Sequence, residues 1–247
     1  SFDSFNVRGA YSKKIGEIGL TIFGEQAESD GYRMNGDHKT DAGGLRLDWG
    51  SESDVKGYFS WGLSNSDFGL PGDLNASSLA ADRRQTTDPN DQGNDRSAHA
   101  RSGLSYNIND QWRLENRFGY QDRRVRVNMP SIPFGGYLPE TDYETFYYTP
   151  VLHYDSKVAD WLFGLDFSKD YLDAETNYGD SEYERKTLAF FTSTGIPLSE
   201  QLNLNGNLRI ETVEDSGVYS GSQLNTVSKD ECCLLYTSPS PRDPTKS

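Results

Sequence analysis

The side chains with the widest chemical repertoire in this chain are three histidines, His38, His99 and His153. A histidine beside an acid or a serine can support acid–base or nucleophilic catalysis. The three histidines are far apart in the sequence, and no spacing motif links any of them to a nucleophile. Isolated histidines are the commoner outcome, so we expect no enzyme activity and no catalytic residue.

An acidic stretch has some features of a calcium-binding loop. It reads DPNDQGND over residues 88–95, and Asp88, Asn90, Gln92 and Gly93 fit early positions of such a loop. The bidentate glutamate that must close the loop is absent, because His99 stands in its place. We therefore predict a solvated acidic loop, with no metal site and no cofactor.

Two basic clusters are conspicuous in a protein with a formal net charge of −14. One lies in a predicted loop, and the other follows a predicted strand and includes Arg126. They either balance charge at the surface or bind an anionic ligand through charge-assisted hydrogen bonds, with an aromatic contact nearby. The candidate ligand-binding residues are Arg83, Arg84, Arg123, Arg124 and Tyr137.

The composition limits the class of protein. The 247 residues are only 34% hydrophobic but 13% aromatic. The aliphatic content is too low for a large globular core, and the aromatic content is too high for a disordered chain. No apolar run approaches the roughly 20 residues of a membrane-spanning helix. The acidic balance argues against nucleic-acid binding.

Strict alternation of apolar and polar residues predicts an all-β fold. In LNLNGNLRIE (202–211), leucines and an isoleucine occupy even-numbered positions, while asparagines, Arg209 and Glu211 occupy odd-numbered ones. Such a strand has one apolar and one polar face. About ten segments show this pattern, and none shows a helical period. The others are FNVRGAY, IGLTIFGE, GLRLDWG, VKGYFSWGL, ARSGLSYNI, WRLENRFGY, TFYYTPVLHY, WLFGLDF and TLAFFTSTGI.

The connections between these segments alternate in length. Short, turn-like connections are expected at 13–17, 51–53, 107–110, 154–157 and 197–201, and long polar ones at 28–40, 66–96, 128–141, 170–185 and from 213 onward. A soluble sandwich has no reason to keep this rhythm. An antiparallel up-and-down transmembrane barrel has one, because its turns are short on one side of the membrane and its loops long on the other.

The position of tryptophan agrees with a barrel. Trp49, Trp112 and Trp161 each lie within a few residues of a short connection, as in an interfacial aromatic girdle. The alternative is that they close the bottom of a soluble sandwich. In the barrel, the apolar residues of each strand face outward on the convex side, and the alternating polar residues face a water-filled lumen. The first set includes Leu45, Leu47, Leu114, Phe163, Leu165, Leu204 and Leu208, and the second Arg46, Arg113, Arg117, Asn205 and Arg209.

Several motifs resemble the barrel of TonB-dependent outer-membrane receptors. They are SDGYR before an early strand, the loop GLPG…ADRRQT…DP after a long strand, and WLFGLDF followed by an acidic stretch and TLAFFTSTGIPLSEQLNLNGNLRIE. The resemblance covers nearly all of residues 1–230. It implies a barrel of about 22 strands around a plug domain, of which this chain supplies about ten strands. The chain opens on SFDSFNVRGAY, which already has the alternation of a strand, so we expect an incomplete barrel from an internal fragment.

The resemblance also implies a function. The receptor would bind a scarce ligand, most often a ferric siderophore, at its outer loops, and TonB acting on the plug would power import. The implied location is the outer membrane of a Gram-negative bacterium, with lipid and lipopolysaccharide as partners. Two alternatives stay open, namely a passive porin-type channel and a secreted β-rich carbohydrate-binding module.

The last residues break the pattern. Residues 1–230 are expected to form the partial barrel and 231–247 a disordered, non-native tail. CLLYTSPSPRD (233–243) resembles translated sequencing-adapter read-through, and Pro239, Pro241 and Pro244 remove ladder donors at short intervals. Both cysteines lie in this region, so no intramolecular disulfide framework is expected. From Cys233 onward we predict no regular strand pairing.

Overall fold

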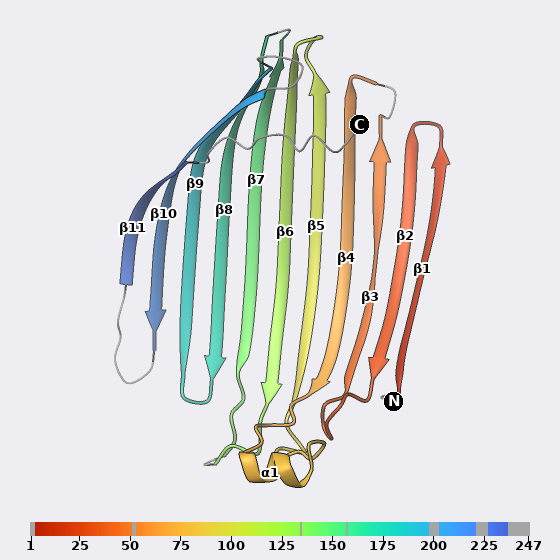
Figure 1. Cartoon of the computed structure of the whole chain (residues 1–247), viewed down its shortest axis with the longest axis vertical. Coiled ribbons are helices and arrows are strands. Elements are labelled where there is room, and N and C mark those ends of the chain that lie inside the picture. Colours follow the sequence, from red (N-terminus) through yellow and green to blue (C-terminus); the bar gives the residue numbers. More distant parts are fainter. Residues whose placement is uncertain are drawn as a thin grey trace.

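The chain forms one antiparallel sheet of eleven strands, ordered β1 to β11 as in the sequence (Figure 1). The structure is a computed structural model that describes residues 3–50, 53–133, 135–156, 158–197 and 203–220, and the backbone of 227–236. The strands are β1 (Ser4–Ile15), β2 (Ile18–Ser29), β3 (His38–Trp49), β4 (Val55–Gly69), β5 (Gln92–Asn107), β6 (Trp112–Asn128), β7 (Glu140–Asp155), β8 (Asp160–Thr176), β9 (Gly179–Pro197), β10 (Asn203–Tyr219) and β11 (Val227–Tyr236).

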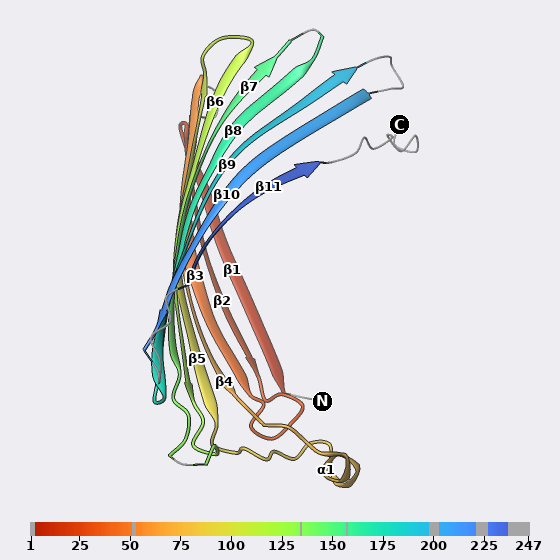
Figure 2. The same ribbon diagram turned by 90° about the vertical axis from the view of Figure 1, so that its left-hand side faces the viewer.

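The sheet is curved and open. Figure 2 shows it bending around a hollow, and β1 does not pair with β11 in the described residues. A short helix, α1 (Ala76–Ala81), lies between β4 and β5. No helix in the described part of the chain is long and apolar enough to cross a membrane. The predicted all-β antiparallel architecture with minor helix is confirmed.

Consecutive strands are joined at alternate ends of the sheet. We call the end that joins β1 to β2, β3 to β4 and so on the turn end, and the end that joins β2 to β3, β4 to β5 and so on the loop end (Figure 1). Loop-end connections include 30–37, 70–91 and 129–139, as the sequence pattern predicts. The predicted long loop at 170–185 is wrong, because β8 and β9 leave only residues 177–178 between them. Both faces are polar there, so the strands carry no hydrophobic alternation.

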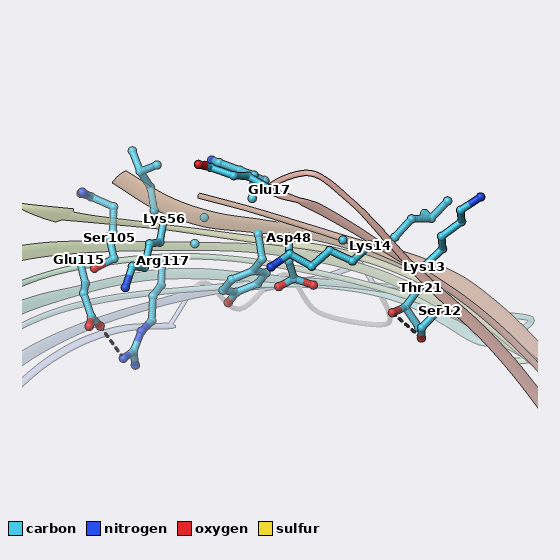
Figure 3. Close-up of a pocket in the computed structure, with 18 residues that line it drawn as sticks. Ser12, Lys13, Lys14, Glu17, Thr21, Asp48, Lys56, Ser105, Glu115 and Arg117 are labelled. Atoms are coloured by element: carbon cyan, nitrogen blue, oxygen red, sulfur yellow. Dashed lines mark hydrogen bonds and ion pairs between the residues drawn. The ribbon is translucent and has the colours of Figure 1, made fainter. Parts of the chain in front are cut away.

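The pairing register places the apolar residues of the strands on one face of the sheet and the alternating polar residues on the other. Leu47 lies opposite Phe59, and Leu208 lies opposite Thr192, which lies opposite Phe163. Arg46 instead lies opposite Ser60 and Thr21. We call the apolar convex face the outer face and the polar concave face the inner face. In Figure 3, Ser12, Thr21, Asp48 and Arg117 point into the hollow of the curved sheet.

The sheet has almost no core of its own. Among the described residues, only Val151, Ala159 and Ala189 are buried hydrophobics. Large side chains of the outer face, such as Trp61, Leu165 and Phe190, are exposed. A single sheet with an exposed apolar face excludes the packed sandwich, in which the leucines would lie between two sheets. It fits the wall of a barrel, whose apolar face contacts lipid.

Glycines on the inner face accept aromatic rings from the neighbouring strand. The ring of Tyr58 lies over Gly103, Tyr147 over Gly119, and Phe191 over Gly164. His99 covers Gly62 in the same way, 2.6 Å from where a Cβ would lie. A glycine under a ring lets the ring lie flat and lets the sheet bend toward that face. These pairs contribute to the curvature that forms the hollow.

The last strand corrects the expectation for the tail. The backbone of β11 pairs regularly with β10 from Val227 opposite Gly217 to Tyr236 opposite Leu208. The prediction that residues from Cys233 onward lack strand pairing is therefore wrong for 233–236, and β11 crosses the domain boundary expected at residue 230. Short local pairing needs only backbone donors and acceptors, which this stretch retains up to its first proline. Residues 237–247 lie outside the described residues.

Replacing Gly119 with alanine should destabilise the sheet. A Cβ there would overlap the ring of Tyr147, and overpacking of this kind costs roughly 1–3 kcal/mol. Urea unfolding of the protein in detergent, followed by tryptophan fluorescence, measures the loss. Gly9→Ala is the matched control, because nothing lies within 4 Å of a Cβ at Gly9. Equal stability of the two variants would contradict the role assigned to the ring–glycine pair.

Candidate functional site

A clamp formed by Arg33 ties two loop-end connections together. Its guanidinium donates hydrogen bonds to the carbonyl oxygens of Gln85 (3.1 Å), Gly72 (2.5 Å) and Pro71 (3.0 Å). The backbone N–H of Met34 donates to the carbonyl of Arg84 at 2.7 Å. Connection 30–37 is therefore bonded to connection 70–91 near residues 71–72 and near residues 84–85, and the cationic side chain gives a donor to three carbonyls outside the strands.

Asn35 makes a second clamp on the same connection. Its φ of 56° is left-handed, a conformation that asparagine tolerates better than most residues. Its side-chain amide lies 2.6 Å from the carbonyl of Asp88 and 2.8 Å from that of Asp91. The turn therefore aims the amide at the far end of connection 70–91.

Asp91 extends the contact to a third connection. Its carboxylate accepts hydrogen bonds from the backbone N–H of Ser131 at 3.1 Å and from the Ser131 hydroxyl at 2.5 Å. Asp91 is only 4% exposed, and residues 92–95 belong to β5, so the prediction of a solvated acidic loop over 88–95 is wrong at these positions. A buried carboxylate needs such donors to offset its desolvation. No group of three or more metal-binding side chains occurs in the described residues.

The aromatic candidate Tyr137 lies at the same end of the sheet. Its ring stacks on Tyr178 with centroids 5.9 Å apart. Asn177 donates to the carbonyl of Gly136 at 2.9 Å, which fixes the two-residue β8–β9 turn against connection 129–139. Tyr178 is 57% exposed, so this aromatic pair is available to a ligand at the rim.

The two loop arginines differ in their contacts. Arg84 donates to the carbonyl of Tyr32 at 3.2 Å, and its own N–H is bound by Asp82 at 2.8 Å. Arg83 is exposed and makes no hydrogen bond or ion pair among the described residues. Figures 1 and 2 show the adjacent α1 beyond the ends of β4 and β5, displaced toward the hollow. The predicted pair follows α1 in the same loop-end connection.

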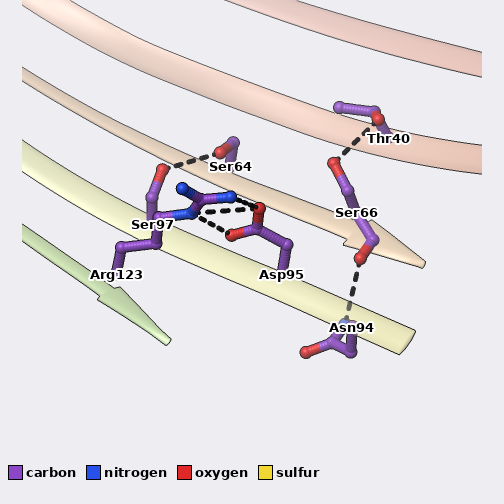
Figure 4. A network of polar contacts seen from close by, with 7 residues as sticks. All are labelled: Thr40, Ser64, Ser66, Asn94, Asp95, Ser97 and Arg123. Carbon is purple, nitrogen blue, oxygen red and sulfur yellow. Dashed lines mark hydrogen bonds and ion pairs between the residues drawn. The ribbon is translucent and has the colours of Figure 1, made fainter. Parts of the chain in front are cut away.

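Arg123 lies on the inner face, where it pairs with Asp95 at 2.5 Å (Figure 4). Its guanidinium also lies 5.9 Å from the ring of Tyr143. Arg124, the next residue, points to the outer face and pairs with Asp142 at 2.5 Å. The expectation that Arg123 and Arg124 form one cluster beyond a strand is wrong, because both are inside β6 and adjacent residues face opposite sides of a strand.

Other arginine–carboxylate pairs on the inner face were missing from the sequence-based candidates. Arg46 binds Asp48 at 2.6 Å and covers the ring of Tyr58 at 4.2 Å. Arg209 binds Glu211 at 2.6 Å and also contacts Asp166. The i, i+2 spacing of Arg46 and Asp48, and of Arg209 and Glu211, is a signal that sequence reading could have used. Cross-strand pairs such as Arg185 with Asp215, 2.7 Å apart, require the register.

The histidines are not brought together. They lie on β3, β5 and β7 in different rows of the sheet. His38 contacts Thr40 at 2.8 Å, His99 covers Gly62, and His153 lies 3.6 Å from Glu115. Of the three, only His38 has a hydroxyl beside its ring, and no carboxylate in the described residues is bonded to that ring. The inner face presents guanidinium, hydroxyl and amide groups, and these groups can bind a ligand.

The outer face carries a band of defined height. Along β6 it presents Trp112, Leu114, Phe118 and Tyr120, and the ring of Trp112 lies 4.5 Å from that of Tyr154. From Trp112 to Tyr120 the strand rises roughly 26 Å at about 3.3 Å per residue. Beyond Tyr120 the same face becomes charged, with Arg124 and Arg126 bound to acids. Because barrel strands are tilted, the fitting comparison is by residue number, and the nine residues from Trp112 to Tyr120 match the roughly 9–11 residues with which a strand crosses a membrane.

Comparison with known proteins identifies similar sheets. Residues 26–240 match the sequence profile of the family described as TonB dependent receptor-like, beta-barrel. No protein of curated function matches the chain by sequence.

Solved structures give the same picture. The chain is similar to the ferric yersiniabactin uptake receptor FyuA from Yersinia pestis, with a TM-score of 0.81 and 14% identity over 95% of this chain and 41% of that one. It is also similar to the ferric citrate transporter FecA, with a TM-score of 0.77 and 13% identity over 94% and 39%. The siderophore receptor PiuA from Acinetobacter baumannii gives 0.74 and 13% over 95% and 44%. The chain thus spans about two fifths of the length of these receptors.

Removing the buried carboxylate should loosen the loop end. In Asp91→Ala, Ser131 loses the charged acceptor of two hydrogen bonds, and a hydrogen bond to a charged group contributes roughly 1.5–3 kcal/mol. Limited trypsin digestion should cleave after Arg83 and Arg84 faster than in the parent protein, because local opening exposes the backbone. Asp73→Ala, at an exposed position of the same connection, should leave the rate unchanged. Equal rates in all three proteins would show that Asp91 does not hold the loops.

Proposed function

The chain belongs to the TonB-dependent receptor-like β-barrel family, and from this premise we propose that it forms part of the barrel wall of an outer-membrane receptor. The receptor takes up a scarce ligand, most simply a ferric siderophore, across the outer membrane of a Gram-negative bacterium. TonB, acting on a plug domain inside the complete barrel, supplies the energy. The chain itself carries out no reaction chemistry.

One observation carries the proposal, namely the division of a single curved sheet into an apolar outer band and a polar inner wall. The band, with exposed side chains such as Trp61 and Leu165, contacts lipid hydrocarbon. The inner wall, with ion pairs such as Arg123–Asp95, is hydrated. In the described residues the sheet has open edges at β1 and β11. Lipid cannot satisfy the backbone groups of such edges, so we infer that further strands complete the barrel.

The outer rim supplies contacts to the outer leaflet. Beyond the apolar band, Lys169 and Lys186 both bind Glu184, at 2.6 and 2.7 Å. They lie at the height at which lipid headgroups begin, if the band spans the hydrocarbon. Lipopolysaccharide phosphates are therefore the partner that we assign to this level of the outer face.

Ligand binding is assigned to the inner wall and the loop end. Arg123 with Tyr143 presents a cation beside an aromatic ring on the inner face. Arg83, Arg84 and Tyr137 lie in the loop-end connections 70–91 and 129–139. A ferric chelate is anionic and often carries aromatic or carboxylate groups, which such side chains bind through charge-assisted hydrogen bonds and stacking.

Uptake should depend on TonB. Cells that produce the complete protein under iron limitation should accumulate radioactive iron from a matching ferric siderophore, and a strain without TonB should bind it without accumulating it. A passive channel would give equal accumulation in both strains. A secreted carbohydrate-binding module would give none, and the protein would be absent from the outer-membrane fraction. Either result would overturn the proposal.

Adjacent arginines offer a matched test of which face binds the ligand. Arg123→Ala, combined with Asp95→Ala so that no carboxylate is left unpaired, should weaken siderophore binding roughly tenfold or more, since a hydrogen bond to a charged group contributes about 1.5–3 kcal/mol. Arg124→Ala with Asp142→Ala, one residue away on the outer face, should leave it unchanged. Equilibrium binding to purified protein measures both, and an equal effect of the two double variants would contradict binding at the inner face.

A further inference from the structure

The sequence contains two Asn–Gly pairs, Asn35–Gly36 and Asn205–Gly206. An asparagine followed by glycine is especially prone to deamidation, because the glycine has no side chain to shield its backbone nitrogen from the asparagine side chain. The reaction is intramolecular, so its rate depends on whether the backbone lets the two groups meet. The fold places the two pairs in contrasting surroundings.

The pair Asn205–Gly206 is held in a regular strand. It lies in β10, where Asn205 is opposite Gly195 and Gly206 is opposite Thr194. In an extended strand the side chain stands roughly perpendicular to the sheet, while the next backbone nitrogen lies within the sheet. Asn205 is exposed to water, so its protection comes from the strand backbone and not from burial.

The pair Asn35–Gly36 lies in connection 30–37, outside the strands, and is protected by contacts instead. The side-chain nitrogen of Asn35 lies within hydrogen-bond distance of three carbonyl oxygens, those of Leu70 (3.2 Å), Asp88 (2.6 Å) and Asp91 (2.8 Å). The backbone N–H of Gly36 donates to the carbonyl of Arg33 at 3.0 Å. Both reacting groups are therefore engaged elsewhere while connection 30–37 stays bonded to connection 70–91.

We propose that Asn35–Gly36 is a deamidation site controlled by this clamp, intact while the two connections are joined and reactive when they separate. The Gly36 nitrogen loses its proton to solvent and attacks Cγ of Asn35. A bond forms between that nitrogen and Cγ, the Cγ–Nδ2 bond breaks, and ammonia leaves. Water then opens the cyclic imide, which leaves aspartate or isoaspartate at position 35.

The product cannot rebuild the clamp. A carboxylate at position 35 would face the carbonyl oxygens of Asp88 and Asp91 without a hydrogen to donate, so an attractive contact becomes a repulsive one. Isoaspartate also adds a backbone atom to a turn that is already closed, since a Cβ at Gly31 would lie 1.9 Å from the Gly36 carbonyl oxygen. Deamidation therefore makes an opening of the loop end permanent.

The rate of deamidation tests the control by the clamp. The purified complete protein is incubated in detergent at mildly alkaline pH, and peptide mass spectrometry measures both Asn–Gly pairs in the same sample. Arg33→Ala should raise the rate at Asn35 about tenfold or more, the increase in opening expected when charge-assisted hydrogen bonds are lost. The rate at Asn205 should stay at the parent level.

The matched control is Arg83→Ala. Arg83 is exposed, lies in connection 70–91 and makes no hydrogen bond or ion pair in the part of the chain that the structure describes. A parent-like rate at Asn35 in Arg33→Ala, or an equal rise in Arg83→Ala, would overturn the proposal. The Asn205 pair reports general unfolding, so a rise at Asn35 no larger than the rise at Asn205 would also overturn it.

The consequence is tested with Asn35→Asp, which reproduces the aspartate product. Limited trypsin digestion after Arg83 and Arg84 should be about tenfold faster than in the parent, because the loop end opens more often. Asn205→Asp, the same change in a strand, should leave the rate unchanged. Parent-like digestion of Asn35→Asp would show that the product still holds the loops and would overturn the permanent release. Both assays use protein without ligand, so their outcome is independent of the proposed uptake.

Discussion

A single unbroken register links all eleven strands, and the rest of the structure depends on it. Because successive side chains alternate between faces, one register places Leu47 with Phe59 outside and Arg46 with Ser60 inside. A slip of one residue would move the entire apolar set to the hollow and the arginines to the outer face. At Pro150 the pairing of β7 with β8 is interrupted, yet Tyr148–Phe167 and Val151–Gly164 keep the same register on either side. The Thr149 hydroxyl donates to Asp166 across this gap at 2.9 Å.

Curvature and polarity of the inner face have a common origin. A sheet that bends toward one face crowds the side chains of that face, so small residues and flat rings are favoured there. Glycines at 62, 103, 119 and 164 meet this demand, and each lies under a ring from a neighbouring strand. The same choice leaves spaces between the longer polar side chains. The shape of the sheet therefore depends on the small residues and rings that line its inner face.

The strands were predictable from the sequence, and their ends were not. Alternation such as that of 202–211 identifies a strand wherever one face is apolar, which is the case inside the band between Trp112 and Tyr120. It fails at 170–185, where β8 and β9 continue with charged residues on both faces and are held by cross-strand pairs such as Lys169–Glu184. It also fails at β11, which pairs with β10 from Val227 to Tyr236 although its sequence does not alternate. The sequence pattern thus reports the environment of a strand rather than the strand itself.

For the candidate site, the residue types were predictable but their grouping was not. Arg123 and Arg124 are adjacent in sequence yet lie on opposite faces of β6, one with Asp95 and the other with Asp142. Arg33 and Asp91 are far apart in the sequence yet belong to one assembly, because both act through connection 70–91.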